Sequence, residues 1–328
     1  MTALEQHLLD TIQDAFPLEE RPYQVLAGQL GSNEQSVFDA VENLRMSGVI
    51  RRIGGVYDSK ALGFISRLCA GKVSDIDKFA DAVNEIPAIT HNYVRSHEYN
   101  VWFTVIAESE DEIRKIVDGL CTSTDLHDVH ILSATKKFKI NTVMGAGAPV
   151  DSRQLTVDSG VILSEARNSD LSLRKQSPAG ILSDSDRARI RVACTDIPHT
   201  LTPFKDWGVS CEELRDDLAQ KRMRRFGAIL RHQEAGFAYN AMVCFGLDER
   251  RETKDERGWA LAKKPYVSHC YERPVFEGFP YSLYAMMHAR SAEDLECYIK
   301  DAAASIGNPE YVVLHSVKEL KKTSFRFF

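Results

Sequence analysis

Apolar residues in the first fifty positions recur every three or four residues, which is the period of an amphipathic helix. This spacing predicts helices over residues 4–16, 23–30 and 33–47, and Ser32 can cap the start of the third. Residues 49–57 then alternate like a short hairpin, with a glycine pair near its turn. Three helices followed by a two-stranded wing predict a winged helix-turn-helix domain.

The next part of the chain alternates short strand patterns with two helical patterns. Ser109 stands where it can cap the second of these helices. The resulting βαββαβ order predicts a ferredoxin-like domain. The predicted strands are residues 64–73, 90–95, 100–107 and 129–140, and the predicted helices are residues 75–84 and 110–119.

Three stretches of the sequence occur twice, in the same order each time. Their spacing is coherent, and the first pair aligns without a gap. Long matches of this kind indicate an internal repeat, so we expect two homologous halves fused in one chain. Residues 51–64 align with 224–237, residues 89–95 with 267–273, and residues 99–107 with 281–289.

The second half repeats the predicted plan, so the fold class is α+β, with two tandem copies of a winged helix-turn-helix followed by a ferredoxin-like domain. Its helices are predicted over residues 184–194, 204–207, 211–223, 257–263 and 292–304. Its strands are predicted over residues 224–230, 237–247, 267–274, 279–290 and 311–317, before a basic, aromatic tail over 318–328. The predicted domains are 1–60, 61–143, 180–235 and 236–328, with a glycine- and serine-rich linker over 144–179.

Composition narrows the functional classes. The net charge of −6 and the pI near 6.0 argue against a dedicated nucleic-acid binder, which usually carries a basic footprint. The seven cysteines include no Cys-x-x-Cys pair, which favours free thiols over disulfides or a zinc site. Neither a secretory signal nor an apolar run of about 20 residues is visible, so we expect a soluble cytoplasmic protein without a membrane partner.

The predicted hairpin over residues 267–290 carries side chains suited to an anionic ligand. Alternation places Val267, His269, Tyr271 and Arg273 on one face of its first strand, and His288 lies on the second strand. Histidine moves protons near neutral pH, and arginine holds a carboxylate through two parallel hydrogen bonds. Half-buried histidines bonded only to backbone remain the structural alternative.

The architecture resembles that of Lrp/AsnC regulators, but the detailed motifs resemble siroheme decarboxylase. Both halves of the chain carry such motifs, and the fused arrangement resembles the form found in denitrifiers. In the second half these motifs are Arg-Arg-Phe-Gly-Ala and Arg-His-Gln-Glu-Ala-Gly-Phe within 224–237, His-Cys-Tyr-Glu-Arg-Pro at 269–274, and Phe-Pro-Tyr with a later Met-His within 279–288. In the first half they are residues 51–55, 91–95 and 99–103.

This resemblance implies an enzyme that removes two acetate carboxyl groups of siroheme, in synthesis of haem d1 or in an alternative haem pathway. It implies no cofactor beyond the iron that the substrate carries, and no protein metal site. The partner it implies is siroheme, not nucleic acid. A homodimer stays open, because ferredoxin-like domains often pair through their sheets.

Three histidines are the candidates for proton delivery or for an axial contact to iron: His269, His288 and His232. His269 has a counterpart in the first half, His91, whereas Ile106 stands at the position equivalent to His288. The second half is therefore the expected main site. A solvated loop is the alternative for His232.

Arginines are the candidates for binding the substrate carboxylates. Arg95 and Arg273 are matched between the halves, and a structural ion pair is the alternative for either. Arg231 stands where the first half has an aspartate. Arg225 belongs to a pair of arginines beside the wing. In a regulator such a pair would contact phosphates, whereas here it could equally contact propionates or serve the domain interface. His91 completes the expected substrate-binding set.

The predicted recognition helices argue against a regulator. From Gly31 to Arg51 there are 20 positions, and from Gly208 to Arg224 there are 16, so about one helical turn is missing in the second half. The first-half helix is mainly acidic, which suits a phosphate-lined groove poorly. A fused Lrp-type regulator sensing a tetrapyrrole or another small molecule, and a haem carrier without catalysis, are the rival hypotheses.

Overall fold

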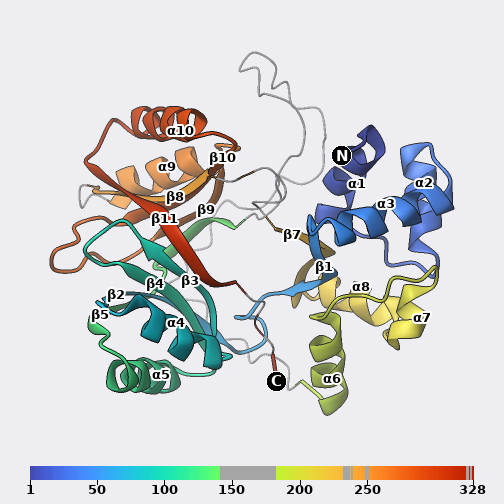
Figure 1. Ribbon diagram of the computed structural model, residues 1–328, viewed down its shortest axis with the longest axis horizontal. Coiled ribbons are helices and arrows are strands. Elements are labelled where there is room, and N and C mark those ends of the chain that lie inside the picture. Colours follow the sequence, from blue (N-terminus) through green and yellow to red (C-terminus); the bar gives the residue numbers. More distant parts are fainter. Residues whose placement is uncertain (141–181, 232–236, 238, 248–250, 323–324, 326) are drawn as a thin grey trace.

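The computed structural model of the chain describes residues 1–140, 182–231, 237, 239–247, 251–322, 325 and 327–328. Figure 1 shows two parts, one built on β-sheet with helices outside it and one made of the two winged helices. The segment predicted as a linker, residues 144–179, lies outside the described residues. No helix in the described ranges combines the length and apolar character that a membrane span requires.

Three helices and a strand form the winged-helix part of each half. In the first half Asn33, not the predicted Ser32, caps the third helix, because its side chain accepts the N–H of Ser36 at 2.9 Å. The first set is α1 (Ala3–Asp14), α2 (Pro22–Leu30), α3 (Glu34–Met46) and β1 (Ile50–Tyr57). The second set is α6 (Asp184–Ala193), α7 (Pro203–Trp207), α8 (Cys211–Ala219) and β7 (Met223–Leu230).

The lengths of the two recognition helices confirm the predicted loss of one turn. Helix α3 has 13 residues and α8 has nine, a difference of four.

The wing is not the predicted hairpin. Strand β1 runs without a turn and pairs antiparallel with β7 of the other half, with Gly54 opposite Gly227. The glycines mark close backbone approach: a Cβ at Gly54 would lie 2.4 Å from the carbonyl oxygen of Thr195, and one at Gly227 would lie 2.5 Å from that of Ile12. The two winged helices consequently share one hydrophobic core.

The remaining strands of the described residues form one nine-stranded sheet, in the order β5-β2-β4-β3-β11-β8-β10-β9-β6. Five of these strands come from the first half and four from the second, and two helices of each half cover its part of the sheet (Figure 1). The strands are β2 (Ile65–Lys72), β3 (Ile89–Arg95), β4 (Val101–Ala107), β5 (His127–Leu132), β6 (Lys136–Ile140), β8 (Tyr239–Phe245), β9 (Val267–Glu272), β10 (Leu283–Ala289) and β11 (Tyr311–Lys322). The helices are α4 (Ile76–Glu85), α5 (Glu110–Ser123), α9 (Arg251–Ala262) and α10 (Ala292–Ser305).

The last strand of each half crosses into the other half. The predicted single strand over 129–140 was wrong, since it is divided into β5, which pairs with β2, and β6, which pairs with β9. Strand β11 pairs first with β8 and then, beyond the predicted end at Val317, with β3. The halves thus form a single exchanged sheet in which each completes the other.

The two faces of the sheet have different partners. Residues such as Phe103 and Ala285 pack beneath the helices of their own halves. On the opposite face, Trp102, Phe279 and Tyr284 form a cluster that contains residues of both halves. This shared apolar cluster lies next to the polar residues described below.

The aromatic tail joins the two parts of the molecule. Phe325, Phe327 and Phe328 pack against Phe64 and the winged-helix core, with ring centroids 5.3 to 5.5 Å from that of Phe64. The predicted free tail is therefore partly strand β11 and partly a buried anchor.

Candidate active site

The hairpin of β9 and β10 presents the polar residues that the sequence singled out. Its second strand alternates between the two faces: Leu283, Ala285 and Met287 pack beneath the helices, while Tyr284 and Met286 belong to the opposite cluster. The first strand departs from the prediction, because a register shift opposite Met286 and Met287 moves Val267 onto the helix-covered face. This bulge leaves Ser268 and His269 together.

Ser268 brings the two candidate histidines of the second half together. Its Oγ lies 2.9 Å from Nδ1 of His269 and 3.0 Å from Nε2 of His288, and it donates to the backbone carbonyl of Met286 at 3.3 Å. His288 is 8% exposed, and His269 is half-buried on the strand beside it. Two groups able to carry protons thus share one hydroxyl.

The first half contains only part of this arrangement. Strand β3 has a register shift at the same place, and Oγ1 of Thr90 lies 3.0 Å from Nδ1 of the exposed His91. Ile106 stands where His288 stands in the second half. The hydroxyl–histidine pair is therefore duplicated, but the two-histidine cluster exists in the second half alone.

Arg95 of the first half reaches onto the sheet of the second half. Its Nη1 donates to the carbonyl of Leu314 at 3.2 Å and to Oγ of Ser316 at 2.6 Å, and its Nη2 lies 4.0 Å from Sδ of Met286. The ring of Tyr93 lies 4.6 Å from the guanidinium carbon. Because Met286 pairs with His269 on the neighbouring strand, Arg95 belongs to the same region as the histidines.

Arg95 is a buried cation that forms no salt bridge within the described part of the chain. It is 4% exposed, and its Nε has no hydrogen-bond partner there. Burial lowers its pKa, an effect that the nearby Tyr93 and Glu319 partly oppose. The Nε–Nη2 edge, the edge that binds a carboxylate with two parallel hydrogen bonds, is thus left without a strong acceptor.

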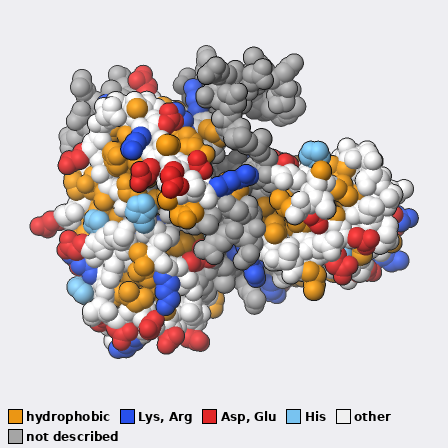
Figure 2. All heavy atoms as spheres, turned by 45° about the horizontal axis from the view of Figure 1, so that its top comes forward, with side chains coloured by type: hydrophobic (Ala, Val, Ile, Leu, Met, Phe, Trp, Pro, Cys, Tyr) orange, Lys and Arg blue, Asp and Glu red, His pale blue; other side chains and the backbone are white. Residues whose placement is uncertain are grey.

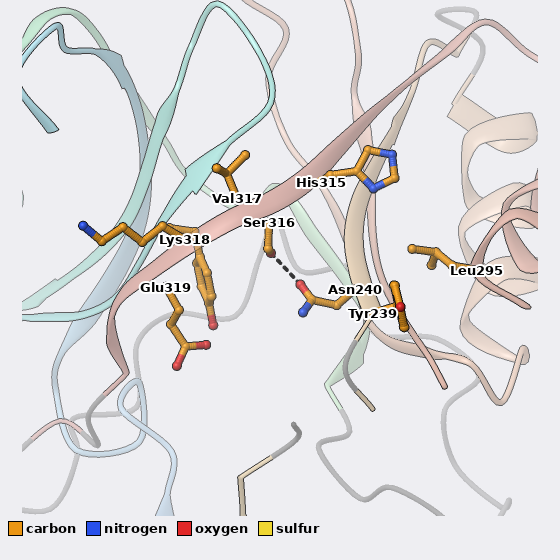
Figure 3. Close-up of a pocket in the computed structure, with 9 residues that line it drawn as sticks. Tyr239, Asn240, Leu295, His315, Ser316, Val317, Lys318 and Glu319 are labelled. Atoms are coloured by element: carbon orange, nitrogen blue, oxygen red, sulfur yellow. Dashed lines mark hydrogen bonds between the residues drawn. The ribbon is translucent and has the colours of Figure 1, made fainter. Parts of the chain in front are cut away.

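A small pocket lies beside this arginine. Its volume is about 160 Å³, and Asn240 and Ser316 in its wall are joined by a hydrogen bond of 2.5 Å (Figure 3). Asn240 also lies directly across from His288 in the sheet. The rim carries Tyr239, 45% exposed, and Val317, 65% exposed. The pocket has room for a substituent of a large ligand, since whole drug-sized ligands occupy roughly 300–1,000 Å³.

Arg273 is the counterpart of Arg95 in the other half. Its Nη1 donates to the carbonyl of Leu132 at 2.8 Å, and its guanidinium lies over the rings of Tyr271 and Tyr284 at 5.0 and 5.8 Å. Burial lowers its pKa as well, and its Nε has no partner among the described residues. At the place of Ser316, however, the first-half strand that Arg273 contacts has Ala134.

Two other predicted site residues, Arg225 and Arg231, have different contacts. A third, His232, lies outside the described residues. Arg225 donates to the carbonyls of Gln13 and Ala228, the latter at 3.2 Å, which favours a structural role at the wing. Arg231 has an exposed side chain, and its backbone N–H donates to the carbonyl of Val49 at 3.0 Å. Their roles in substrate binding stay predictions.

Sequence reasoning missed the polar residues that orient the site. Ser268, Ser316 and Asn240 are ordinary polar strand residues, and only the register between strands reveals what they contact. The match between Ser268 and Thr90, both before a duplicated histidine, is the one signal in the sequence that points to any of them. The described residues include no cluster of three or more His, Cys, Asp or Glu able to hold a metal ion.

Comparison with known proteins identifies the family of the chain. Residues 61–139 and 234–321 match the AsnC-like ligand binding domain, and residues 5–51 match the siroheme decarboxylase NirDL-like HTH domain. The siroheme decarboxylase alpha subunit of Desulfovibrio desulfuricans is 46% identical over 43% of this chain and 82% of its own length. The chain belongs to the siroheme decarboxylase family.

Two further relatives extend the family match over the whole chain. The siroheme decarboxylase of Hydrogenobacter thermophilus is 29% identical over 98% of this chain and 94% of its own. The crystal structure of the siroheme decarboxylase NirDL in complex with an iron-uroporphyrin III analogue has 26% identity and a TM-score of 0.62, covering 98% of this chain and 93% of that one. The fused two-half organisation is thus common to this chain and those family members.

Proposed function

We propose that this protein removes the carboxyl groups of two acetate side chains of siroheme, giving didecarboxysiroheme for haem d1 or for an alternative haem pathway. In this proposal it is a carboxy-lyase. The observation that carries the proposal is the buried Arg95, whose Nε has no hydrogen-bond partner among the described residues, beside two histidines that share Ser268. An arginine to anchor an acid and histidines to supply protons are the groups that such a reaction needs.

Substrate binding follows from charge and apolar surface together. Siroheme is a flat macrocycle that carries eight carboxylates, so it needs cations for its edge and apolar surface for its ring. Arg95 supplies a guanidinium whose charge is poorly compensated inside the protein, and a carboxylate there would offset the cost of burying it. Tyr239 and Val317 expose apolar surface at the rim of the adjoining pocket.

The histidines would supply the protons. Each acetate loses carbon dioxide when its carbon–carbon bond breaks, and the electron pair left on the methylene carbon takes up one proton to form a methyl group. Two decarboxylations therefore consume two protons. His269 and His288 are the two histidines joined through Ser268, and histidine carries protons near neutral pH.

The macrocycle itself would delocalise the electron pair before protonation, so we propose that no organic cofactor is added. The iron in the reaction arrives with the substrate. The work of the protein is to hold the correct acetates and to supply protons at the correct carbon.

Anaerobic incubation of the purified protein with siroheme, followed by mass spectrometry, tests the proposal. The expected product has lost the mass of two carbon dioxide molecules. Siroheme that binds but stays intact would instead support a carrier. A protein that neither binds nor changes siroheme would overturn the proposal.

The regulator hypothesis has little support in the winged helices. Arg45, the basic residue in the last turn of α3, forms an ion pair with Asp196 at 2.6 Å, and Arg21 pairs with Glu34. On the face shown in Figure 2, basic side chains form no continuous stripe across the winged-helix part. A scaffold role therefore fits these domains better than DNA binding.

A further inference from the structure

The contacts of Ser268 determine how its hydrogen bonds must be arranged. A serine hydroxyl has one proton to donate and two lone pairs that accept. The carbonyl of Met286, at 3.3 Å, can only accept, so it takes the hydroxyl proton. Both lone pairs then face imidazole nitrogens, at 2.9 Å and 3.0 Å. All three contacts are satisfied together only when both histidines donate an N–H to Ser268.

We propose that Ser268 is a positioning residue that fixes the tautomers of both catalytic histidines. It holds His269 protonated at Nδ1 and His288 protonated at Nε2. A second proton on either ring is then carried on the opposite nitrogen, Nε2 of His269 or the buried Nδ1 of His288. This assignment deepens the proposed function and rests on it for the catalytic role of the two rings.

The local backbone supports this assignment. The bulge in β9 places Ser268 and His269 next to each other instead of on opposite faces, and Ser268 is 7% exposed. Bulges commonly re-aim side chains beside active sites.

The first half provides a natural comparison. Thr90 makes the same contact to Nδ1 of His91, so a threonine fits the bulge and presents its hydroxyl in the same direction. Ile106 removes the second imidazole there. Ser268→Thr is therefore expected to keep the arrangement, and Thr90→Ala is a matched control that removes a hydroxyl of the same kind from the other half.

The decisive measurement is ¹⁵N NMR of histidine-labelled protein without substrate, with His269→Gln and His288→Gln variants to assign the signals. We expect the Nδ1–H tautomer for His269 and the Nε2–H tautomer for His288. Ser268→Ala is expected to lose both preferences, whereas Ser268→Thr and Thr90→Ala retain them. Opposite tautomers in the native protein, or unchanged tautomers in Ser268→Ala, would overturn the assignment.

Kinetics provide the second readout. Ser268→Ala is expected to lower kcat by at least about tenfold, because well-placed general acids contribute roughly 10²–10⁴-fold, while the Kd for siroheme changes less than about twofold. Ser268→Thr should restore the rate. A Ser268→Ala enzyme with the native kcat would contradict the positioning role. A native protein that does not decarboxylate siroheme would refute the proposed function alone, since the tautomers are measured without substrate.

Discussion

Replacing Arg95 by methionine should separate substrate binding from folding. Arg95 is almost fully buried and forms no salt bridge with any described residue. Methionine keeps an unbranched chain of similar reach and removes the charge. We expect the variant to lose affinity for siroheme and to keep its stability.

The expected magnitudes follow from the contacts. Removing a charge from a buried position regains several kcal/mol of solvation. The hydrogen bonds to the carbonyl of Leu314 and to Ser316 are charge-assisted, and losing both costs about 3–6 kcal/mol. These two effects nearly cancel, so the free energy of unfolding should change by less than about 1.5 kcal/mol. A bidentate carboxylate contact is worth roughly 3 kcal/mol, or about a hundredfold in Kd.

Urea denaturation and anaerobic siroheme titration measure the two effects. Arg95→Lys keeps the positive charge but loses the planar guanidinium group that binds a carboxylate through two hydrogen bonds. Its Kd for siroheme should therefore lie between those of the native protein and of Arg95→Met. Arg273→Met, at the equivalent position, shows whether the macrocycle is also held from the other half. If Arg95→Met unfolds several kcal/mol more easily and binds siroheme normally, Arg95 is a structural residue and the reasoning fails.

Three further predictions concern activity, stability and pH. His288→Ile copies the first half at Ile106, so the protein should fold and bind siroheme while kcat falls by about a hundredfold or more in anaerobic turnover. Asp217→Asn removes a buried carboxylate that pairs with Arg189 and Arg222 and should cost about 3 kcal/mol in urea denaturation, against less than about 1 kcal/mol for the exposed Asp184→Asn. Hydrogen bonds from Ser74 lower the pKa of Asp125 from 3.8 to about 2. Its stabilising effect is therefore complete above the unfolded pKa and is lost as pH falls toward 2, so Asp125→Asn should flatten that part of an acid titration followed by circular dichroism.

Local elements were predictable because they depend on local patterns. Helical spacing identified the helices, and the cap Ser109 marked where one of them begins. Strand partners depend on contacts between distant residues and were not predictable in the same way. A glycine pair is a turn signal in sequence, but at Gly54 it permits a backbone contact with Thr195 that no local pattern records.

The candidate site could likewise be predicted only in part. Comparing the two halves identified Arg95, Arg273 and His269, since duplicated motifs preserve them. It also identified His288 as the difference between the halves. The residues that orient these groups could not be inferred, because Ser316 is a neighbour of Arg95 only through the pairing of β11 with β3.

The exchanged sheet explains how one chain holds two similar arginine sites with different chemistry. Arg95 donates to the backbone carbonyl of Leu314, and Arg273 donates to that of Leu132, each in the opposite half of the chain. The fold itself therefore buries both guanidinium groups. Side chains then distinguish them. The guanidinium of Arg95 is held by Ser316 and adjoins a two-histidine cluster, whereas Arg273 reaches the first half, which has Ala134 and Ile106 at the matching positions. A carboxylate can be anchored at either guanidinium, but the paired histidines lie on strands of the second half alone, which favours that half of the sheet as the place where the acetates lose carbon dioxide.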